Sequence, residues 1–576
     1  MAAPDSPTTI PSPRDDPATR VAWLESELAT ARARIAELTR ERDELRAAYD
    51  RLWVEVELMR RRIFVAKAER VDTTQLEIEF KDKLAALDAL AGTLGIGPNT
   101  DGEAGNGNKP GASRPKPKGR RNLRGIQMPE ERLELKDPEF ESLVAKGQAE
   151  RIGFEESSKI AWQKGGPRRL VVARVKYRVG GDEPETTTIA TAPMPPQIFP
   201  RALATVSLIA RIIVDKHCDG LPLNRQEDRF ARQGVPLDRG TMCRWLEHAG
   251  ATAGATVIEA MRKEAMDKAF CISTDATGVA VQPIPEKGKR QPCRRGHYFV
   301  QIADRDHVFF EYTPQEDSAA VGKMFKGFSG YVQADAQSVF NILFRPPPED
   351  PPDDEDADLS VRKEVGCWSH GRRKFWEATI AKSAVAREGL ARIGRLFALE
   401  RKWKACSAVD KKALRAQFAR PHLDAFFAWA DVEYARVKDQ RGLLRSALGY
   451  AVRQKDALLR YLDDGRLELT NNGSERQLRR IATGRNAWLF VGNDDTAQAA
   501  GHLFSLVASA RLHRLDPEAY LRDFFRVLPH WPRDRYIELA PKYWAATRAR
   551  LAPVELAAEL GPLTVPPPLP PTTEQK

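Results

Sequence analysis

Cysteine is scarce in this chain, and its spacing excludes two kinds of covalent or metal stabilisation. Six cysteines occur in 576 residues. They are Cys218, Cys243, Cys271, Cys293, Cys367 and Cys406, and no two of them form a CxxC pair. This usage argues against a disulfide framework or a thiolate zinc site and suits a reducing compartment, in which each cysteine is a small buried apolar residue.

Long hydrophobic runs are also missing. No stretch approaches the roughly 18 to 20 uncharged apolar residues that a membrane helix needs. Residues 1–20 contain several prolines together with Asp5, Asp15 and Asp16, and they lack the basic and apolar regions of a signal peptide. We therefore expect a disordered N-terminus on an intracellular, cytoplasmic protein with no membrane partner.

Positive charge is in excess. The formal net charge is +11 and the isoelectric point about 9.3, while 42% of the residues are hydrophobic and 30% charged. The length and composition permit several domains with at least one sizeable core. The charge makes a polyanion the natural partner, although it fits RNA binding or simple solubility as well as DNA binding.

Residues 21–68 show the heptad pattern of a coiled coil. One apolar seam runs through Leu24, Ala31, Leu38, Leu45, Leu52 and Met59, and the second through Leu28, Ile35, Tyr49, Val56 and Ile63. Arg42 interrupts the second seam, where a lone polar residue usually sets register or oligomer state. The pattern predicts a homodimer or higher oligomer. One long amphipathic helix folded back on its own chain is the alternative.

Residues 97–125 form a predicted linker, because glycine, asparagine, proline and lysine replace the apolar residues there. Its basic residues are Lys109, Arg114, Lys116, Lys118, Arg120, Arg121 and Arg124, with no acidic residue between them. Such a run would neutralise phosphates along a DNA duplex. A solvated linker without a partner has the same composition.

Two small modules follow the linker. Short alternating runs predict a β-rich module at residues 126–180. Residues 198–265 are predicted to be helical, with a helix, short turn and helix typical of a helix-turn-helix. Asp238 is a candidate N-cap for the second helix, whose Met242 and Trp245 would face the core. The same helix would present Arg239, Thr241 and Arg244 to DNA, although helical hairpins of this length also occur as plain structure.

The predicted pattern changes to strands at Cys271. Strands are expected at residues 271–281, 297–302 and 307–312, then a helix near 318–325 and a short strand at 330–335. This order predicts an α/β domain with a ribonuclease-H-like core, in which the first and fourth strands lie side by side. They carry Asp275 and Asp335.

Two aspartates on neighbouring central strands would repel each other unless a cation lay between them. Mg²⁺ is the expected ion, with Mn²⁺ as a substitute, because hard oxygen ligands suit it and two such ions can activate the attacking oxygen and stabilise the leaving oxygen of a phosphodiester. Taken singly, either aspartate fits a turn cap or a surface ion pair equally well.

Glu475 is the candidate third carboxylate, at a turn that runs into a helix. The stretch Asn472-x-x-Glu475 is also a capping box, in which Glu475 would only satisfy a backbone donor. A basic run beyond it favours catalysis, since surplus positive charge helps a phosphodiester dock against a metal-bound acid. This run is made of Arg476, Arg479, Arg480 and Arg485.

A helical insertion is expected at about residues 376–460, between the second and third acids of a catalytic domain spanning 268–535. His370, just before it, is a candidate auxiliary residue that would assist chemistry or bind phosphate. A structural histidine that caps a helix starting near Gly371 is the alternative. A proline-rich tail is expected at residues 546–576.

Several motifs in order resemble the transposases of insertion sequence family sixty-six. They run from Met59-Arg-Arg-Arg-Ile-Phe-Val-Ala-Lys-Ala-Glu-Arg70 through Leu221-Pro-Leu-Asn-Arg-Gln-Glu227, Gly366-Cys-Trp-Ser-His-Gly-Arg-Arg-Lys-Phe375 and Asn471-Asn-Gly-Ser-Glu-Arg476 to Trp488-Leu-Phe490, and the resemblance ends near Trp544. The resemblance implies a ribonuclease-H-like core with an Asp, Asp, Glu triad, which falls on Asp275, Asp335 and Glu475.

This chain departs from the family pattern in two places. Asp275 stands in Thr274-Asp275-Ala276-Thr277 rather than in an Asp-Glu-Thr-Pro-like stretch. The family's module before the helix-turn-helix often carries paired cysteines for zinc, but no cysteine precedes Cys218 here. We therefore expect no structural zinc, and any DNA contact by the module must rest on Arg168, Arg169, Arg174 and Lys176.

The sequence thus predicts a DNA transposase that hydrolyses a phosphodiester at each transposon end and then joins the freed 3′ hydroxyl to target DNA. The alternative is a catalytically inactive or domesticated relative that binds DNA without cutting it. The expected partners of the predicted transposase are double-stranded DNA, further copies of the same chain and accessory proteins of the same element. Its expected place of action is the bacterial nucleoid.

Deleting residues 21–68 should abolish self-association and leave the catalytic domain folded, because the heptad seams are separated from that domain by the linker. Light scattering of the full-length and shortened chains measures the change. An unchanged oligomeric mass after the deletion would show that the heptads serve another purpose.

Overall fold

The computed structural model describes residues 129–163, 165–179, 188–282, 291–346, 358, 360–380 and 383–570, with residue 16, most of 21–45 and residues 85, 86 and 89. The chain divides into two compact units. One comprises Met1–Pro117 with Gln440–Gly442, and the other Lys118–Asp439 with Leu443–Lys576.

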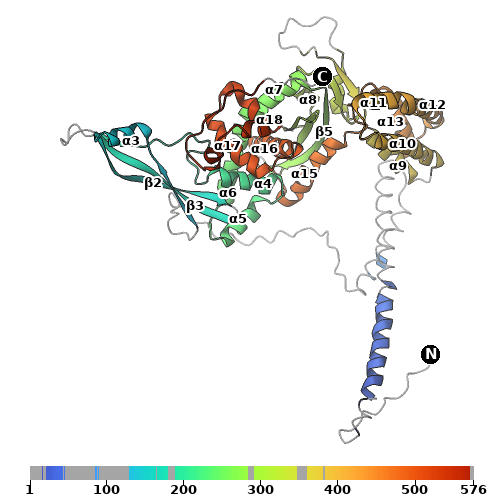
Figure 1. Ribbon diagram of the computed structural model, residues 1–576. Coiled ribbons are helices and arrows are strands. Elements are labelled where there is room, and N and C mark those ends of the chain that lie inside the picture. Colours follow the sequence, from blue (N-terminus) through green and yellow to red (C-terminus); the bar gives the residue numbers. More distant parts are fainter. Residues whose placement is uncertain are drawn as a thin grey trace. The chain divides into compact units, whose positions relative to one another are not determined.

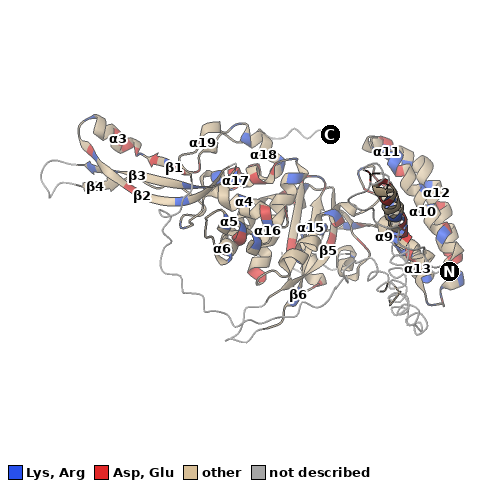
Figure 2. Cartoon of the chain, turned by 90° about the horizontal axis from the view of Figure 1, so that it is seen from below, with Lys and Arg blue, Asp and Glu red and all other residues tan. Residues whose placement is uncertain are grey.

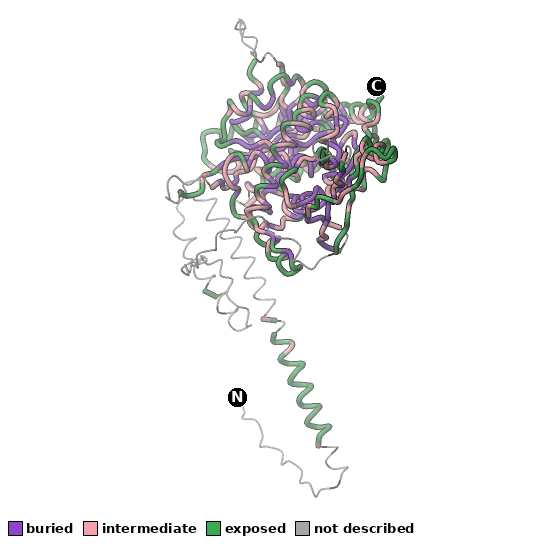
Figure 3. The backbone as a smooth tube through the Cα atoms, turned by 90° about the vertical axis from the view of Figure 1, so that its left-hand side faces the viewer, coloured by how far each residue is buried: buried purple, intermediate pink, exposed green. Residues whose placement is uncertain are grey.

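The described residues between 21 and 45 are helical (Figure 1). They are exposed along most of this length (Figure 3). Leu24, Leu28, Ile35 and Leu38 of the predicted seams are 57%, 50%, 64% and 47% exposed. A single chain therefore leaves these apolar side chains uncovered. Residues 46–68 of the predicted coiled coil, nearly all of 1–20 and the whole predicted linker, with Lys116, Lys118, Arg120 and Arg121, lie outside the described residues.

A small twisted sheet begins the second unit, within the segment predicted to be rich in strands. Its elements are β1 (Glu130–Leu135), α3 (Pro138–Ala145), β2 (Ala149–Gln163), β3 (Gly166–Val179) and β4 (Thr188–Thr191). β2 and β3 form a long antiparallel hairpin, and β1 and β4 both pair with β3. The hairpin turns at Gly165 and Gly166, whose φ angles of 103° and 153° favour glycine.

The module's arginines are engaged within it. Arg168 pairs with Glu131 at 2.9 Å, and Arg169 and Arg174 pair with Glu130 and Glu155. Basic and acidic residues are interspersed along these strands (Figure 2). The suggestion that these arginines supply the module's DNA contacts therefore requires the ion pairs to open.

Four helices and one π-helical turn follow the module. They are α4 (Val206–His217), α5 (Leu223–Arg232), α6 (Arg239–Ala253), the π turn Gly254–Ile258 and α7 (Glu259–Lys268). The Asp238 side chain accepts hydrogen bonds from the backbone N–H groups of Gly240 and Thr241 at 2.9 and 3.2 Å, which confirms it as the N-cap of α6. Met242 and Trp245 are buried, as the helical pattern predicted.

The central sheet of the second unit has five strands in the order β7-β6-β5-β8-β9. Its elements are β5 (Cys271–Val281), β6 (Arg294–Ala303), β7 (His307–Thr313), α8 (Ser318–Met324), β8 (Gly330–Gln333), the 3₁₀ helix Ser338–Phe344 and β9 (Arg362–Val365). β5, β6 and β7 are antiparallel neighbours, whereas β8 pairs with β5 and β9 in parallel. The predicted adjacency of the first and fourth strands is therefore observed.

Helices after β9 form a second core beyond the sheet. They are α9 (Trp368–Thr379), α10 (Ala384–Lys402), α11 (Ala408–Leu414), the π turn Arg415–Ala419, α12 (Arg420–Val437), α13 (Leu443–Arg453), α14 (Lys455–Leu459) and the 3₁₀ turn Arg460–Leu462. Trp368, Phe375, Phe426 and Phe427 pack together in this core. Within the second unit, these helices and the β-rich module lie at opposite ends of the central sheet (Figures 1 and 2).

The chain then returns to the sheet through a last group of helices. They are α15 (Asn472–Trp488), α16 (Asp494–Leu512), α17 (Pro517–Val527), the 3₁₀ turns Leu528–His530 and Arg533–Leu539, α18 (Pro541–Arg548) and α19 (Pro553–Ala557). α16 is buried along most of its length. Its Ser505 and Ser509 hydroxyls accept hydrogen bonds from the backbone of β7 at 2.8 and 2.9 Å. Among the described residues, no helix is both long and apolar enough to span a membrane.

The C-terminal segment is held against this group. Arg526 donates to the carbonyl oxygens of Ala558, Gly561 and Pro562, each at 3.0 Å. The described part of the predicted proline-rich tail therefore packs on the second unit.

Gly250 is the residue through which α6 contacts α16. A Cβ added there would lie 2.2 Å from the Ala499 carbonyl oxygen, so the helices must separate to admit it. Gly250→Ala should lower the free energy of unfolding by about 1–3 kcal/mol, as expected for overpacking, and denaturant titration measures it. Gly394→Ala in α10, whose added Cβ meets nothing within 4 Å, is the control and should be neutral or stabilising. Equal losses in both variants would contradict the argument.

Candidate active site

Strand register brings Asp275 and Asp335 together. β5 and β8 pair in parallel, with Ser273 opposite Gln333. Asp275 lies two residues further along β5, and Asp335 lies two residues beyond the last residue of β8. The charge of Asp335 acts on the Asp275 carboxyl, so the two carboxylates lie near each other.

Burial of the two carboxylates makes their ionisation unfavourable. The pKa of Asp275 is raised to about 7, mainly by burial and also by the charges of Asp335 and Glu475, although a hydrogen bond from the Ala276 N–H at 2.7 Å opposes the rise. Burial also raises the pKa of Asp335, opposed by a hydrogen bond from Gln337 Nε2 at 2.6 Å and by His370. The second oxygen of Asp335, Oδ1, is buried without a hydrogen-bond partner.

Glu475 faces this pair from the first turn of α15. The helix is held against β5 by Ser474, whose hydroxyl lies 2.8 Å from that of Ser273, and by Asn471, whose amide donates to the Thr274 carbonyl at 3.4 Å. The capping-box alternative is wrong. Asn471 is the N-cap residue and no side chain caps the helix, so the Glu475 side chain is left for other contacts.

These other contacts come from α9. His370 Nε2 lies 3.6 Å and Arg373 Nη2 3.9 Å from Glu475 Oε1. Burial lowers the pKa of His370, while Asp335 and Glu475 act to raise it. α9 begins at Trp368 with Cys367 as N-cap, so His370 lies inside the helix and does not cap one that starts near Gly371. The histidine therefore stands between the second and third acids.

The donor set fits a hard cation. It consists of carboxylate oxygens, one of them buried and unpaired, and Mg²⁺ prefers such ligands. Within the parts of the chain that the structure describes, however, no three His, Cys, Asp or Glu side chains converge closely enough to hold one ion. Glu475 is turned toward His370 and Arg373 instead, as expected where like charges meet without a counterion.

The predicted DNA-binding residues lie on two helices. Arg239 and Arg244 are exposed on α6 and Thr241 is partly exposed, with Arg244 donating to the Thr241 hydroxyl at 3.1 Å. Along α15, Arg476, Arg479 and Arg485 are exposed. Arg480 differs from them, because its guanidinium is partly buried beside Arg511 and burial lowers its pKa.

A groove beside Glu475 contains residues that sequence reasoning missed. Its volume is about 510 Å³. It is lined by Ser369, Arg372, Arg373, Trp376 and Glu377 of α9 and by Asn472 and Glu475 of α15. The signal was present in the sequence, because positions 369, 372, 373 and 376 share one face of a helix, and positions 368, 371, 375 and 378 share the buried face.

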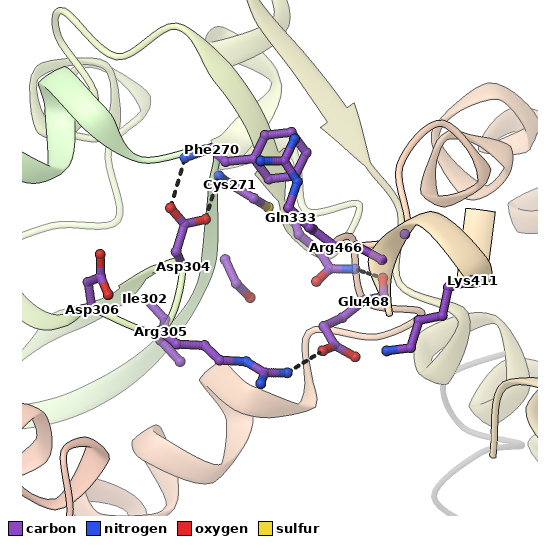
Figure 4. A pocket seen from close by; sticks show the side chains of 13 residues that line it. Phe270, Cys271, Ile302, Asp304, Arg305, Asp306, Gln333, Lys411, Arg466 and Glu468 are labelled. Atoms are coloured by element: carbon purple, nitrogen blue, oxygen red, sulfur yellow. Dashed lines mark hydrogen bonds and ion pairs between the residues drawn. The ribbon is translucent and has the colours of Figure 1, made fainter. Parts of the chain in front are cut away.

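A second pocket is lined by Cys271 and Ser273 at the start of β5 and by Gln333, and several of its polar groups bond to one another (Figure 4). Asp304 accepts from the backbone N–H groups of Phe270 and Cys271, each at 2.9 Å. The Glu468 carboxylate accepts a hydrogen bond from Arg305 at 3.2 Å, and the Glu468 backbone carbonyl accepts one from the Gln333 side chain at 2.7 Å. These internal bonds indicate a structural role.

Comparison with known families places this site in a defined group of proteins. Residues 201–499 match the Transposase IS66 family and residues 505–542 match the IS66 C-terminal element. The chain belongs to the IS66 family of transposases. The matched region contains Asp275, Asp335 and Glu475.

Three proteins of Sinorhizobium fredii (strain NBRC 101917 / NGR234) are similar to the chain. y4hP is 28% identical over 397 residues, which cover 64% of this chain and 67% of that protein. y4qI is 25% identical over 420 residues, 71% of this chain and 74% of that protein. y4jD is 25% identical over 350 residues, 58% of this chain and 65% of that protein. All are named only as uncharacterized proteins, so they assign no activity.

The raised pKa of Asp275 predicts a pH-dependent stability. A carboxyl with a pKa of about 7 in the folded state and about 4 when unfolded stabilises the fold at low pH, and this stabilisation is lost as pH rises from about 4 to 7. Asp275→Asn should therefore be more stable than wild type at pH 8 in EDTA, by on the order of 2 kcal/mol after solvent screening, and the difference should shrink at pH 5. Thermal unfolding at both pH values measures it. A difference that does not change with pH would contradict the assignment.

Proposed function

We propose that this chain is a DDE transposase that cuts phosphodiesters at transposon ends and transfers the freed 3′ strand to target DNA. The observation that carries the proposal is that the charges of Asp335 and Glu475 both act on Asp275, next to the paired strands β5 and β8 and inside the region matched to the transposase family. The order β7-β6-β5-β8-β9, antiparallel on one side and parallel on the other, supports a ribonuclease-H-like core.

Asp275, Asp335 and Glu475 are the proposed ligands of Mg²⁺, or of Mn²⁺ in its place. Two such ions, when bound, activate the attacking oxygen and neutralise the leaving one. The chain's own residues prepare this site. Asp275 lies on β5 and Asp335 just beyond the end of β8, and their raised pKa values mean that a bound cation would favour their ionised forms.

His370 and Arg373 are proposed to position Glu475. Both face the same carboxylate oxygen, at 3.6 and 3.9 Å. A positive charge at that distance attracts the Glu475 carboxylate and limits the directions in which its side chain can turn. Both reactions are proposed as direct attack on phosphorus, by water and then by the 3′ hydroxyl, without a covalent protein intermediate.

Duplex DNA is the proposed substrate and its contacts are proposed on several elements. The N-terminal turn of α6 would contribute Arg239, Thr241 and Arg244 as a helix-turn-helix, and the exposed arginines of α15 would contact phosphates beside the cut. The basic residues of 97–125 would add sequence-independent affinity. The apolar seams of residues 21–68 would join two or more chains, and accessory proteins of the same element are further candidate partners. The site of action would be the bacterial cytoplasm.

The second candidate function is DNA binding without catalysis. The absence of a closed metal site among the described residues favours it. The presence of all three acids on one face favours the enzyme, since a protein that only binds DNA gains nothing from buried carboxylates that repel each other.

Asp275→Asn, Asp335→Asn and Glu475→Gln should each lower DNA-end cleavage and strand transfer by about a thousandfold or more, because ligands of one metal cluster act as a unit. Each amide keeps the size of the side chain and removes the charge. The loss of cleavage is measured by nicking of a labelled transposon end in Mg²⁺, and DNA binding by each variant is measured in parallel. Asp424→Asn, an exposed carboxylate of α12, is the control and should cut normally. Near-normal cleavage by Glu475→Gln would show that Glu475 is not a metal ligand. Near-normal cleavage by all three variants would contradict the catalytic proposal and leave DNA binding as the function.

A further inference from the structure

Trp376 is exposed in an unusual way. Its side chain is 49% exposed, whereas the other large aromatics of α9, Trp368 and Phe375, are buried. Among the described residues, no other tryptophan is exposed to this extent. Removing so large an apolar ring from water is favourable, so the exposed face of Trp376 is available to a ligand in the groove that it lines.

The groove beside Trp376 has the size of a nucleotide site. Its volume of about 510 Å³ lies in the range of pockets that hold one small molecule. It admits one or two nucleotides of a single strand. A double helix, whose major groove alone is about 12 Å wide, does not fit in it.

Charge alone does not account for binding there. Arg372 and Arg373 line the groove, but so do Glu377 and Glu475, so the positive charge is largely balanced. The flat face of an indole attracts any base by stacking, and this attraction does not depend on net charge. The two arginines would then orient the phosphate, because a guanidinium presents a fork of donors to phosphate oxygens.

The position of Trp376 relative to Glu475 sets which nucleotide is bound. Arg373 contacts Glu475 at 3.9 Å. Trp376 is three residues further along α9, about 4.5 Å at 1.5 Å per residue. The base that stacks on it would therefore belong to the nucleotide next to the scissile phosphate, or one step beyond.

We propose that the groove between α9 and α15 binds an unpaired nucleotide of the DNA strand adjacent to the scissile phosphate, with its base stacked on Trp376 and its phosphate bonded by Arg372. The inference rests on the proposed function, since it names the form of DNA that this site receives. It requires the end of the duplex to open before the strand reaches Glu475.

Binding of two DNA probes by the full-length protein tests the proposal in EDTA, where no cleavage occurs. One probe is a labelled duplex with an unpaired 3′ thymidine tail, and the other is the same duplex with blunt ends. Fluorescence anisotropy should show that wild type binds the tailed probe more tightly. Trp376→Ala should bind the tailed probe about tenfold more weakly than wild type, which is the typical contribution of one stacked base. Its affinity for the blunt probe should be unchanged. Trp376→Phe should retain part of the preference.

Phe418→Ala is the matched control, because Phe418 is an equally exposed aromatic, at 48%, in the same group of helices but outside the groove. It should leave both affinities unchanged. The proposal would be overturned if Trp376→Ala bound the tailed probe as tightly as wild type does, or if it lost the same amount of affinity for both probes. This failure is separable from that of the proposed function, which is decided by cleavage in the acid variants and not by binding in EDTA.

Discussion

The parallel pairing of β5 with β8 is the contact on which the candidate site depends. It brings Asp275 of β5 near Asp335, which follows β8, and the charge of Asp335 raises the cost of ionising Asp275. A fold gains no stability from such an arrangement. Its place in the middle of the five-stranded sheet, between β6 and β9, supports the proposal that the pair binds a cation.

The helices beyond the sheet determine where the third acid stands. Arg415 is buried, pairs with Glu400 at 2.8 Å, and donates to the carbonyl oxygens of Tyr461, Asp464 and Leu467. Those carbonyls belong to the segment that leads into α15. Because a buried guanidinium must keep its partners, the path of this segment is tied to the folding of the insertion, and Glu475 depends on helices that contribute no acid themselves.

Local sequence patterns predicted the elements well and two of the side-chain roles badly. Asn472-x-x-Glu475 has the spacing of a capping box, yet the helix begins one residue earlier than such a box needs and Asn471 takes the N-cap position. His370 was weighed as a cap for a helix near Gly371, but α9 begins at Trp368. In both cases the helix start is set by burial. Trp368 packs into the insertion core, and the Asn471 amide bonds β5.

The sequence by itself determined four of the five strands of the central sheet, the N-cap at Asp238, the exposed and buried faces of α6 and the adjacency of β5 and β8, near which Asp275 and Asp335 lie. Periodicity and capping are local, so they can be read without knowing what lies across the fold. Only the tertiary structure decided that α9 and the start of α15 face each other, that His370 and Arg373 reach Glu475 and that Trp376 borders a groove there. These contacts join residues about a hundred positions apart, and they depend on how the insertion packs rather than on any pattern within one segment.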